Sequence, residues 1–282
     1  MVGTGRLAFM RIARFSHNDV PQYAFVQTDE SDGKDYLVAL NGYPLSGKAV
    51  EPTGERYPVD GDGIRLLAPV IPSKVYGLAK NYEAHAQFMH EAGHSEIKHA
   101  PEDMVIFTKP STSVIGPDDP IVIPPYSNDM NFEPEVAVVI GRIAKNVPVE
   151  KAMDYVLGFT CVNDVTLRDL QGLDPMGTRA KGFDTACPLG PWIVTRDDLN
   201  WKDAKISFTL NGEDVPLASG TTANLIHGIP EQIAAISSFA TLLPGDVILT
   251  GTPNASGHLD PGDEAIVHVE GIGDLRNVIM RG

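Results

Sequence analysis

Two apolar runs flanked by acidic residues constrain this chain more than any other feature. Glu133 and Glu135 lead directly into the apolar run 136–140, and Asp164 follows a second run, 155–162. Both runs predict buried strands. Side chains two residues apart in an extended chain leave the same face, so Glu133 and Glu135 are expected to point together. If the two strands are neighbours, the three carboxylates converge.

Three buried carboxylates in one pocket would repel one another and take up protons unless a cation compensates them. Ligands that are all oxygen suit Mg²⁺, Mn²⁺ or Ca²⁺ better than Zn²⁺ or Cu²⁺. The alternative is chance, because the chain has 37 acidic residues. Asp60 and Asp62 have the same spacing around Gly61, and there we expect only a solvated turn.

The charge balance limits the partners of the protein. The 282 residues carry a formal net charge of −15, which opposes binding to nucleic acid and to anionic membrane surfaces. An anionic substrate must therefore be received by a local cation. Cys161 and Cys187 give no basis for a disulfide framework, so the expected location is the reducing cytoplasm. The sequence has no apolar run of about 18 residues that would span a membrane.

Strand patterns divide the chain near residue 70. Residues 1–70 are expected to form a small β-rich domain, and residues 71–282 a larger domain. Residues 1–9 lack the apolar stretch of a signal peptide and are interpreted as an extension before a natural start near Met10. The segment 81–103 is rich in Ala, His, Glu and Gln and helical in pattern only to Gly93, which predicts a mobile flap.

The rest of the chain predicts a mainly β fold with few helices, in the α+β class. The strand pattern 205–210 runs into Asn211-Gly212, a strong signal for a two-residue hairpin. The clearest helix pattern covers residues 222–242. Within it, Pro230 preceded by Gly228 predicts where the helix begins.

One motif suggests different chemistry. His90-Glu91-Ala92-Gly93-His94 has the HExxH spacing of zinc proteases, in which two histidines one helical turn apart bind the metal and the glutamate is the general base. A surface segment is the stronger interpretation, because Gly93 weakens a helix at this point.

The motifs taken together resemble the fumarylacetoacetate hydrolase family, in order from about residue 75 to the C-terminus. The matching motifs are Asn81-Tyr82-x-x-His85, Phe107-x-Lys109-Pro110, Glu133-x-Glu135, Asn163-Asp164-Val165-Thr166-x-Arg168-Asp169-x-Gln171, Ala180-Lys181-Gly182-x-Asp184-Thr185, Gly190-Pro191-Trp192, Asn211-Gly212-Glu213, Pro244-Gly245-Asp246-Val247-Ile248, Gly251-Thr252-Pro253 and Gly271-Ile272-Gly273. The resemblance implies a mixed β-sandwich roll with a smaller N-terminal domain, usually a homodimer.

The same resemblance implies the functional residues. Glu133, Glu135 and Asp164 would bind Mg²⁺, Mn²⁺ or Ca²⁺. Gln171, Lys181 and Tyr82 would face the substrate, Lys181 with a catalytic role, and Thr252 would lie in a loop that receives a carboxylate. Arg168 is in the motif and is expected only to support the strand.

His85 matches a flap histidine that, in hydrolytic members, activates water together with a glutamate three residues later. Residue 88 is phenylalanine here, so that partner is missing. Glu91, Glu96 or Glu102 would have to replace it. Glu91 is six positions from His85, so on one continuous helix the two would face different sides.

The implied chemistry starts from a small 2-oxo acid whose enolate the cation stabilises. Hydrolysis of a C–C bond in an acylpyruvate or fumarylpyruvate is the first expectation. The alternatives are isomerisation of a 2-hydroxyhepta-2,4-dienedioate type of substrate and decarboxylation of oxaloacetate. They rank close behind hydrolysis because residue 88 is phenylalanine. A zinc protease at residues 90–94 and a non-catalytic binding protein are the hypotheses from other classes.

Overall fold

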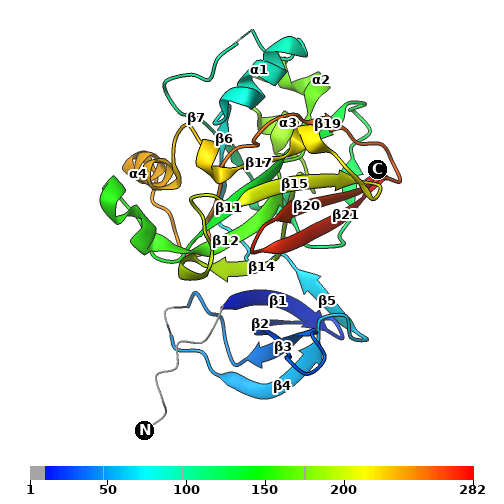
Figure 1. The fold of residues 1–282 in the computed structure, drawn as a ribbon, viewed down its shortest axis with the longest axis vertical. Coiled ribbons are helices and arrows are strands. Elements are labelled where there is room, and N and C mark those ends of the chain that lie inside the picture. The colour runs from blue at the N-terminus through cyan, green and yellow to red at the C-terminus, as the bar shows by residue number, and fades with distance from the viewer. Residues whose placement is uncertain (1–9, 47, 97, 175) are drawn as a thin grey trace.

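The computed structural model describes residues 10–46, 48–96, 98–174 and 176–282, and the interpretation of residues 1–9 lies outside this range. The described residues form a small lobe and a larger lobe, both built mainly of strands (Figure 1). Their sheets contain twelve, six and three strands and include both antiparallel and parallel pairs. The expected mixed, mainly β fold with few helices is confirmed.

The small lobe is one curved sheet. Its strands are β1 (Arg11–His17), β2 (Val20–Thr28), β3 (Asp35–Leu40), β4 (Pro52–Pro58) and β5 (Ile64–Leu67). Asn18 and Asp19 join β1 to β2 with positive φ angles of 49° and 65°, which a tight two-residue hairpin requires. Buried apolar side chains on these strands, among them Phe15 and Leu37, form the core of the lobe.

The two lobes share one hydrogen-bonded sheet. β1 pairs with β14 (Cys187–Thr195) of the large lobe, with Arg11 opposite Val194 and Ile12 opposite Ile193. The guanidinium of Arg11 also lies 4.9 Å from the ring centroid of Trp192. The pairing of β1 with β14 therefore crosses the domain boundary expected near residue 70.

The centre of the large lobe is β11 (Pro134–Ile140), in which every residue is buried. It pairs with β12 (Val156–Asn163) on one side and with β18 (Val247–Leu249) on the other. The two runs predicted as strands from their apolar sequence are thus neighbours, with Pro134 opposite Asn163. The same sheet continues through β6 (Val75–Ala79) and β7 (Val105–Lys109), and β8 (Val114–Ile115) pairs with β14.

Two smaller sheets complete the sandwich. The six-stranded sheet contains β9 (Ile121–Ile123), β15 (Lys205–Leu210), β16 (Glu213–Asp214), β17 (Gly220–Thr221), β20 (Glu264–Val269) and β21 (Gly273–Arg281). Asn211 and Gly212 have positive φ angles in the turn between β15 and β16, so the predicted hairpin is confirmed. The three-stranded sheet contains β10 (Met130–Phe132), β13 (Thr166–Leu167) and β19 (Gly257–His258).

The helices are short, and three of them lie at one end of the large lobe. α1 (Glu83–Glu91), α2 (Arg168–Gln171) and α3 (Thr178–Lys181) gather there, whereas α4 (Ile229–Phe239) lies at the side (Figure 1). α4 begins where the proline predicted it, with Gly228 as the N-cap residue donating its N–H to the Glu231 carboxylate. In the described part of the chain, no helix has the length and apolarity needed to cross a membrane.

Candidate metal centre

The three acidic residues singled out by the sequence meet at the ends of β11 and β12. Glu133 and Glu135 flank Pro134 at the start of β11, and Asp164 follows the last residue of β12. The Asp164 N–H donates to the Glu133 carbonyl at 2.8 Å, which fixes the two backbones together. One carboxylate oxygen from each residue lies within 4.8 Å of the others, and all three residues are buried.

Three buried cations surround these carboxylates. Lys181 Nζ donates to Glu133 Oε2 at 2.9 Å and to Asp164 Oδ2 at 2.5 Å. Lys109 Nζ donates to Asp164 Oδ1 at 2.5 Å, and Arg168 donates to Glu133 Oε1. Burial would lower the pKa of Lys181, but the charges of Asp164 and Glu133 raise it above its ordinary value. Lys181 is therefore positively charged at neutral pH.

Glu135 differs from the other two carboxylates. It accepts a hydrogen bond from the Gly251 N–H at 2.7 Å, and among the described residues no lysine or arginine pairs with it. Burial, together with repulsion from Asp164 and Glu133, raises the pKa of Glu135 well above its ordinary value. Burial would also raise the pKa of Glu133, but the charges of Lys181 and Arg168 hold that pKa below the ordinary value.

This donor set fits a hard divalent cation. All three ligand atoms are carboxylate oxygens, which suit Mg²⁺, Mn²⁺ or Ca²⁺. The protein provides too little positive charge at Glu135 to keep it ionised, and a bound cation would provide the missing charge. Glu133, Glu135 and Asp164 are thus the residues that could hold the ion.

The flap helix α1 carries His85 to the same place. His85 Nδ1 lies 2.5 Å from the Asn254 carbonyl oxygen, and Nε2 lies 4.0 Å from Glu133 Oε1. A carbonyl only accepts, so Nδ1 carries the proton, and Nε2 of the neutral ring has a free lone pair. Burial, supported by Arg168 and opposed by Glu133, lowers the pKa of His85. His85 is therefore neutral and can accept a proton.

No carboxylate replaces the missing glutamate of the flap within the described residues. The Phe88 ring stacks beside the His85 ring, with centroids 6.4 Å apart. The side chains considered as replacements, Glu91, Glu96 and Glu102, are all exposed. His85 consequently has an apolar neighbour on its own helix.

Glu133, Glu135 and most of the other predicted residues line one cavity of about 340 Å³, and Asp164 lies outside its lining. It is lined by Leu78, Ala79, Lys80, His85, Met89, Glu133, Glu135, Gln171, Lys181 and Thr252. Tyr82 is not among the lining residues, and its buried hydroxyl has no hydrogen-bond partner. Burial and the nearby Glu135 raise the pKa of Tyr82 above its ordinary value.

Gln171 and Thr252 are fixed by their neighbours. Gln171 Oε1 accepts a hydrogen bond from Arg168 Nη1 at 2.8 Å, and Thr252 Oγ1 donates to the Pro134 carbonyl at 3.1 Å. Arg168 Nη2 also donates to Ser256 Oγ at 2.7 Å. Arg168 therefore does more than support a strand, because it links Glu133 of the carboxylate cluster to Gln171 of the cavity wall.

Sequence reasoning missed Lys109 as well as this role of Arg168. Lys109 ends β7 and is 1% exposed, which is rare for a lysine. Its position at the end of a strand, in the motif Phe107-x-Lys109-Pro110, was the available signal. The side chain was not linked to Asp164 because the contact joins residues 55 positions apart.

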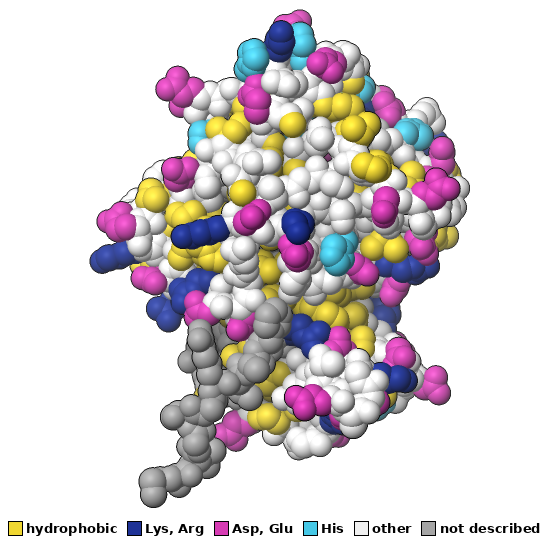
Figure 2. Space-filling view, in the orientation of Figure 1, with side chains coloured by type: hydrophobic (Ala, Val, Ile, Leu, Met, Phe, Trp, Pro, Cys, Tyr) yellow, Lys and Arg dark blue, Asp and Glu magenta, His cyan; other side chains and the backbone are white. Residues whose placement is uncertain are grey.

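The HExxH spacing does not produce a metal site in the described residues. α1 ends at Glu91, and Gly93 has a φ of 75°, so His94 lies beyond the helix. His90 instead pairs through Nδ1 with the Ser95 carbonyl. Histidine side chains stand at the surface at this end of the molecule (Figure 2). Within the described chain, Glu133, Glu135 and Asp164 are the grouping that could hold an ion.

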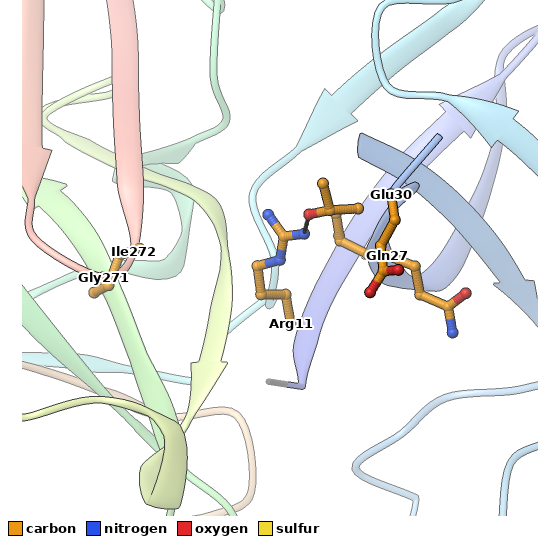
Figure 3. A pocket seen from close by; sticks show the side chains of 7 residues that line it. Arg11, Gln27, Glu30, Gly271 and Ile272 are labelled. Carbon is orange, nitrogen blue, oxygen red and sulfur yellow. Dashed lines mark hydrogen bonds between the residues drawn. The ribbon is translucent and has the colours of Figure 1, made fainter. Parts of the chain in front are cut away.

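A larger hollow lies between the lobes, and the cation in its wall is held by neighbouring side chains. Arg11 extends between the β1–β2 hairpin and the turn containing Gly271 and Ile272 (Figure 3). Its guanidinium donates to both oxygens of Asp35, at 2.8 and 2.7 Å, and to Thr28. These contacts indicate a structural role, so the smaller cavity is the candidate site.

The chain is similar to several known proteins. Residues 74–280 match the model for the fumarylacetoacetate (FAA) hydrolase C-terminal region, and residues 10–69 match the Rv2993c-like N-terminal model. Protein Rv2993c of Mycobacterium tuberculosis is 44% identical over 276 residues, 96% of this chain and 98% of that protein. The human mitochondrial oxaloacetate tautomerase FAHD2A is 38% identical over 77% of this chain and 70% of its own length.

Solved structures are also similar. The 5-carboxymethyl-2-hydroxymuconate delta-isomerase of Mycobacterium smegmatis superposes with a TM-score of 0.84 at 40% identity, covering 97% of this chain and all of that one. The fumarylpyruvate hydrolase of Pseudomonas aeruginosa, solved with Mn²⁺ and pyruvate, has a TM-score of 0.68 at 28% identity, covering 79% and 94% of the two chains.

Proposed function

The chain belongs to the fumarylacetoacetate hydrolase family, and from that premise we propose that it is a divalent-cation-dependent enzyme that transfers a proton on a small 2-oxo acid. The observation that carries the choice of reaction is the pairing of a buried, neutral His85 with Phe88. This pair provides a proton acceptor, but no second flap group that would direct a water molecule.

The carboxylates would hold the cation, and His85 would move the proton. A divalent cation on Glu133, Glu135 and Asp164 would supply the positive charge that stabilises negative charge on a ketone oxygen. His85 Nε2 takes the proton from the carbon next to the ketone. The electron pair of that C–H bond becomes the carbon–carbon double bond of the enol form, and the protonated His85 then returns its proton to the oxygen.

Lys181 contributes through charge. Its ammonium group donates hydrogen bonds to both Glu133 and Asp164. Its charge also holds the pKa of Glu133 below the ordinary value, as a carboxylate that binds a cation requires. It also lines the cavity beside Gln171, so it is placed to attract the carboxylate of a substrate. Thr252 lines the same cavity next to Gly251, and its hydroxyl would contact that carboxylate by turning its proton away from the Pro134 carbonyl.

Hydrolysis of a C–C bond remains the second candidate. The similarity to a fumarylpyruvate hydrolase solved with Mn²⁺ and pyruvate supports it. His85 would then have to activate water without a carboxylate partner, which is why proton transfer is preferred over the hydrolysis first expected from the motifs. Decarboxylation of oxaloacetate needs neither an activated water molecule nor a carboxylate partner for His85. It can be measured with the same substrate.

The direct test is an assay of the purified protein with added Mn²⁺ or Mg²⁺. We expect it to accelerate the keto–enol exchange of oxaloacetate, followed by ultraviolet absorbance, more than the hydrolysis of fumarylpyruvate or other acylpyruvates. EDTA should abolish the activity. Hydrolysis faster than tautomerisation, or full activity in EDTA, would overturn the proposal.

His85→Ala tests the proton acceptor. Removing the base should lower the tautomerisation rate by roughly 10²–10⁴-fold, while the metal content by elemental analysis stays unchanged. His85→Gln serves as the control for the loss of the ring alone. A rate equal to that of the wild type in His85→Ala would exclude this role.

The remaining expectations are also proposals. We propose a cytoplasmic homodimer with domains at residues 1–70 and 71–282, a flap over residues 81–103, and a place in the catabolism of aromatic compounds. Light scattering of the purified protein tests the dimer. A monomeric mass at micromolar concentration would contradict it.

A further inference from the structure

Lys80 is a cavity residue that the catalytic scheme above does not use. It lies between the end of β6 and the start of α1, and it lines the cavity together with Glu133 and Glu135. Its backbone has a φ of 57°, in the left-handed region that side-chain-bearing residues rarely adopt. Strained backbone of this kind is concentrated at functional sites, where the surrounding structure maintains it.

The charge of Lys80 sets it apart from the other cations of the site. Lys109, Lys181 and Arg168 each pair with a carboxylate of the metal set. Lys80 Nζ donates to Ser95 Oγ at 2.7 Å, a neutral acceptor, and no ion pair joins it to any carboxylate of the described residues. In a chain with 37 acidic and 22 basic residues, a half-buried lysine that pairs with no acid is unusual.

The cavity wall near Lys80 favours a charged contact. Leu78, Ala79 and Met89 line the same space, and apolar walls reduce the screening of an ion pair by water. Burial lowers the pKa of Lys80, so an anion in the cavity would also relieve the cost of burying its charge.

We propose that Lys80 binds the distal carboxylate of a dicarboxylic 2-oxo acid and thereby determines the preference for dicarboxylic over monocarboxylic substrates. This inference rests on the proposed function, because the other end of the substrate is placed at the carboxylate cluster. Lys80 and Lys181 both line this one small cavity, and two cations in one cavity match a molecule with two anionic groups. Lys80 is thus a specificity-determining residue that takes no proton itself.

The test compares oxaloacetate with its 4-methyl ester, which keeps the reacting carbons but lacks the distal charge. In the Mn²⁺-loaded wild type, kcat/KM for tautomerisation should be higher for the acid than for the ester. In Lys80→Met we expect the acid to lose roughly tenfold or more, the usual worth of a charge-assisted hydrogen bond, while the ester changes less than about twofold. Lys80→Arg should keep most of the preference.

Lys98→Met is the matched control, because Lys98 is an exposed lysine on the same flap. It removes the same charge without touching the cavity and should leave both substrates unchanged. Equal losses for acid and ester in Lys80→Met would overturn the inference and indicate a role in flap structure. If the wild type acts on neither substrate, the proposed function fails and this inference fails with it. If the wild type is active but the ratio of kcat/KM for acid to ester is unchanged in Lys80→Met, only the role of Lys80 is rejected.

Discussion

At the scale of single residues, the site is a balance of buried charges. Arg168 and Lys181 stabilise Glu133, and Lys109 and Lys181 stabilise Asp164, whereas Glu135 has only a backbone N–H. A buried carboxylate without a cation favours its protonated form. The protein's own cations therefore favour the ionised form of Glu133, whereas ionisation of Glu135 would depend on a bound cation.

Glu135→Gln should separate stability from metal binding. A carboxyl whose folded pKa exceeds its unfolded pKa stabilises the fold below the unfolded value, and this contribution is lost as the pH rises through the folded value. Without metal, Glu135→Gln should thus become more stable than the wild type as the pH approaches neutrality, by about 1 kcal/mol or more. With Mn²⁺ the order should reverse, because only the wild type binds the ion and gains its binding free energy.

The measurement is urea unfolding between pH 5 and 8, in EDTA and in excess Mn²⁺. Glu133→Gln is the control with the opposite sign. It leaves Arg168 without a carboxylate partner and Lys181 with Asp164 alone, so it should cost about 3 kcal/mol or more even without metal. If Mn²⁺ stabilises Glu135→Gln as much as the wild type, Glu135 is not a ligand.

At the scale of elements, α1 sets which side chains stand beside the carboxylate cluster. The helix places His85 and Phe88 on one face because they are three residues apart. His85 reaches the cluster, and Phe88 covers its ring instead of offering a second proton carrier. The chemistry of the family members would then differ through one flap position rather than through the metal ligands.

Phe88→Glu tests this explanation. A carboxylate at position 88 should raise the pKa of His85 and provide a partner for a water molecule, so hydrolysis of an acylpyruvate should rise by about tenfold or more. Phe88→Gln introduces similar size and polarity without the charge. The explanation is wrong if the glutamate variant hydrolyses no faster than the glutamine variant when both are loaded with Mn²⁺.

At the scale of the whole molecule, a continuous sheet joins the lobes. β1 belongs to the small lobe by its hairpin with β2 and to the large lobe by its ladder with β14. The contact of Arg11 with Trp192 reinforces the junction. Neither lobe can lose this ladder without exposing an unpaired strand edge, which favours aggregation.

The two lobes should therefore unfold together. Differential scanning calorimetry of the full chain should give one transition, with a calorimetric enthalpy equal to the van't Hoff enthalpy. Arg11→Ala should lower the transition temperature by about 2 °C, the shift that about 1 kcal/mol causes in a chain of this length. Two resolved transitions in the wild type would show that the lobes are independent.

Local patterns in the chain were sufficient for its central strands, one hairpin turn and the shared face of two acids. A two-residue period puts Glu133 and Glu135 on one face, the apolar runs predict β11 and β12, and Asn211-Gly212 predicts a hairpin. Each of these features depends on neighbours within a few residues, which the order of amino acids specifies directly.

The partners of those acids depended on contacts between distant segments. Lys109 meets Asp164 across 55 positions, Asn254 orients His85 across 169, and Lys80 shares a cavity with Glu135. Tyr82, expected near substrate, instead lies behind the cavity wall. Such pairings follow from how the sheets stack and where the flap lies, because Coulomb energies depend on distance in space and on burial, not on separation along the chain.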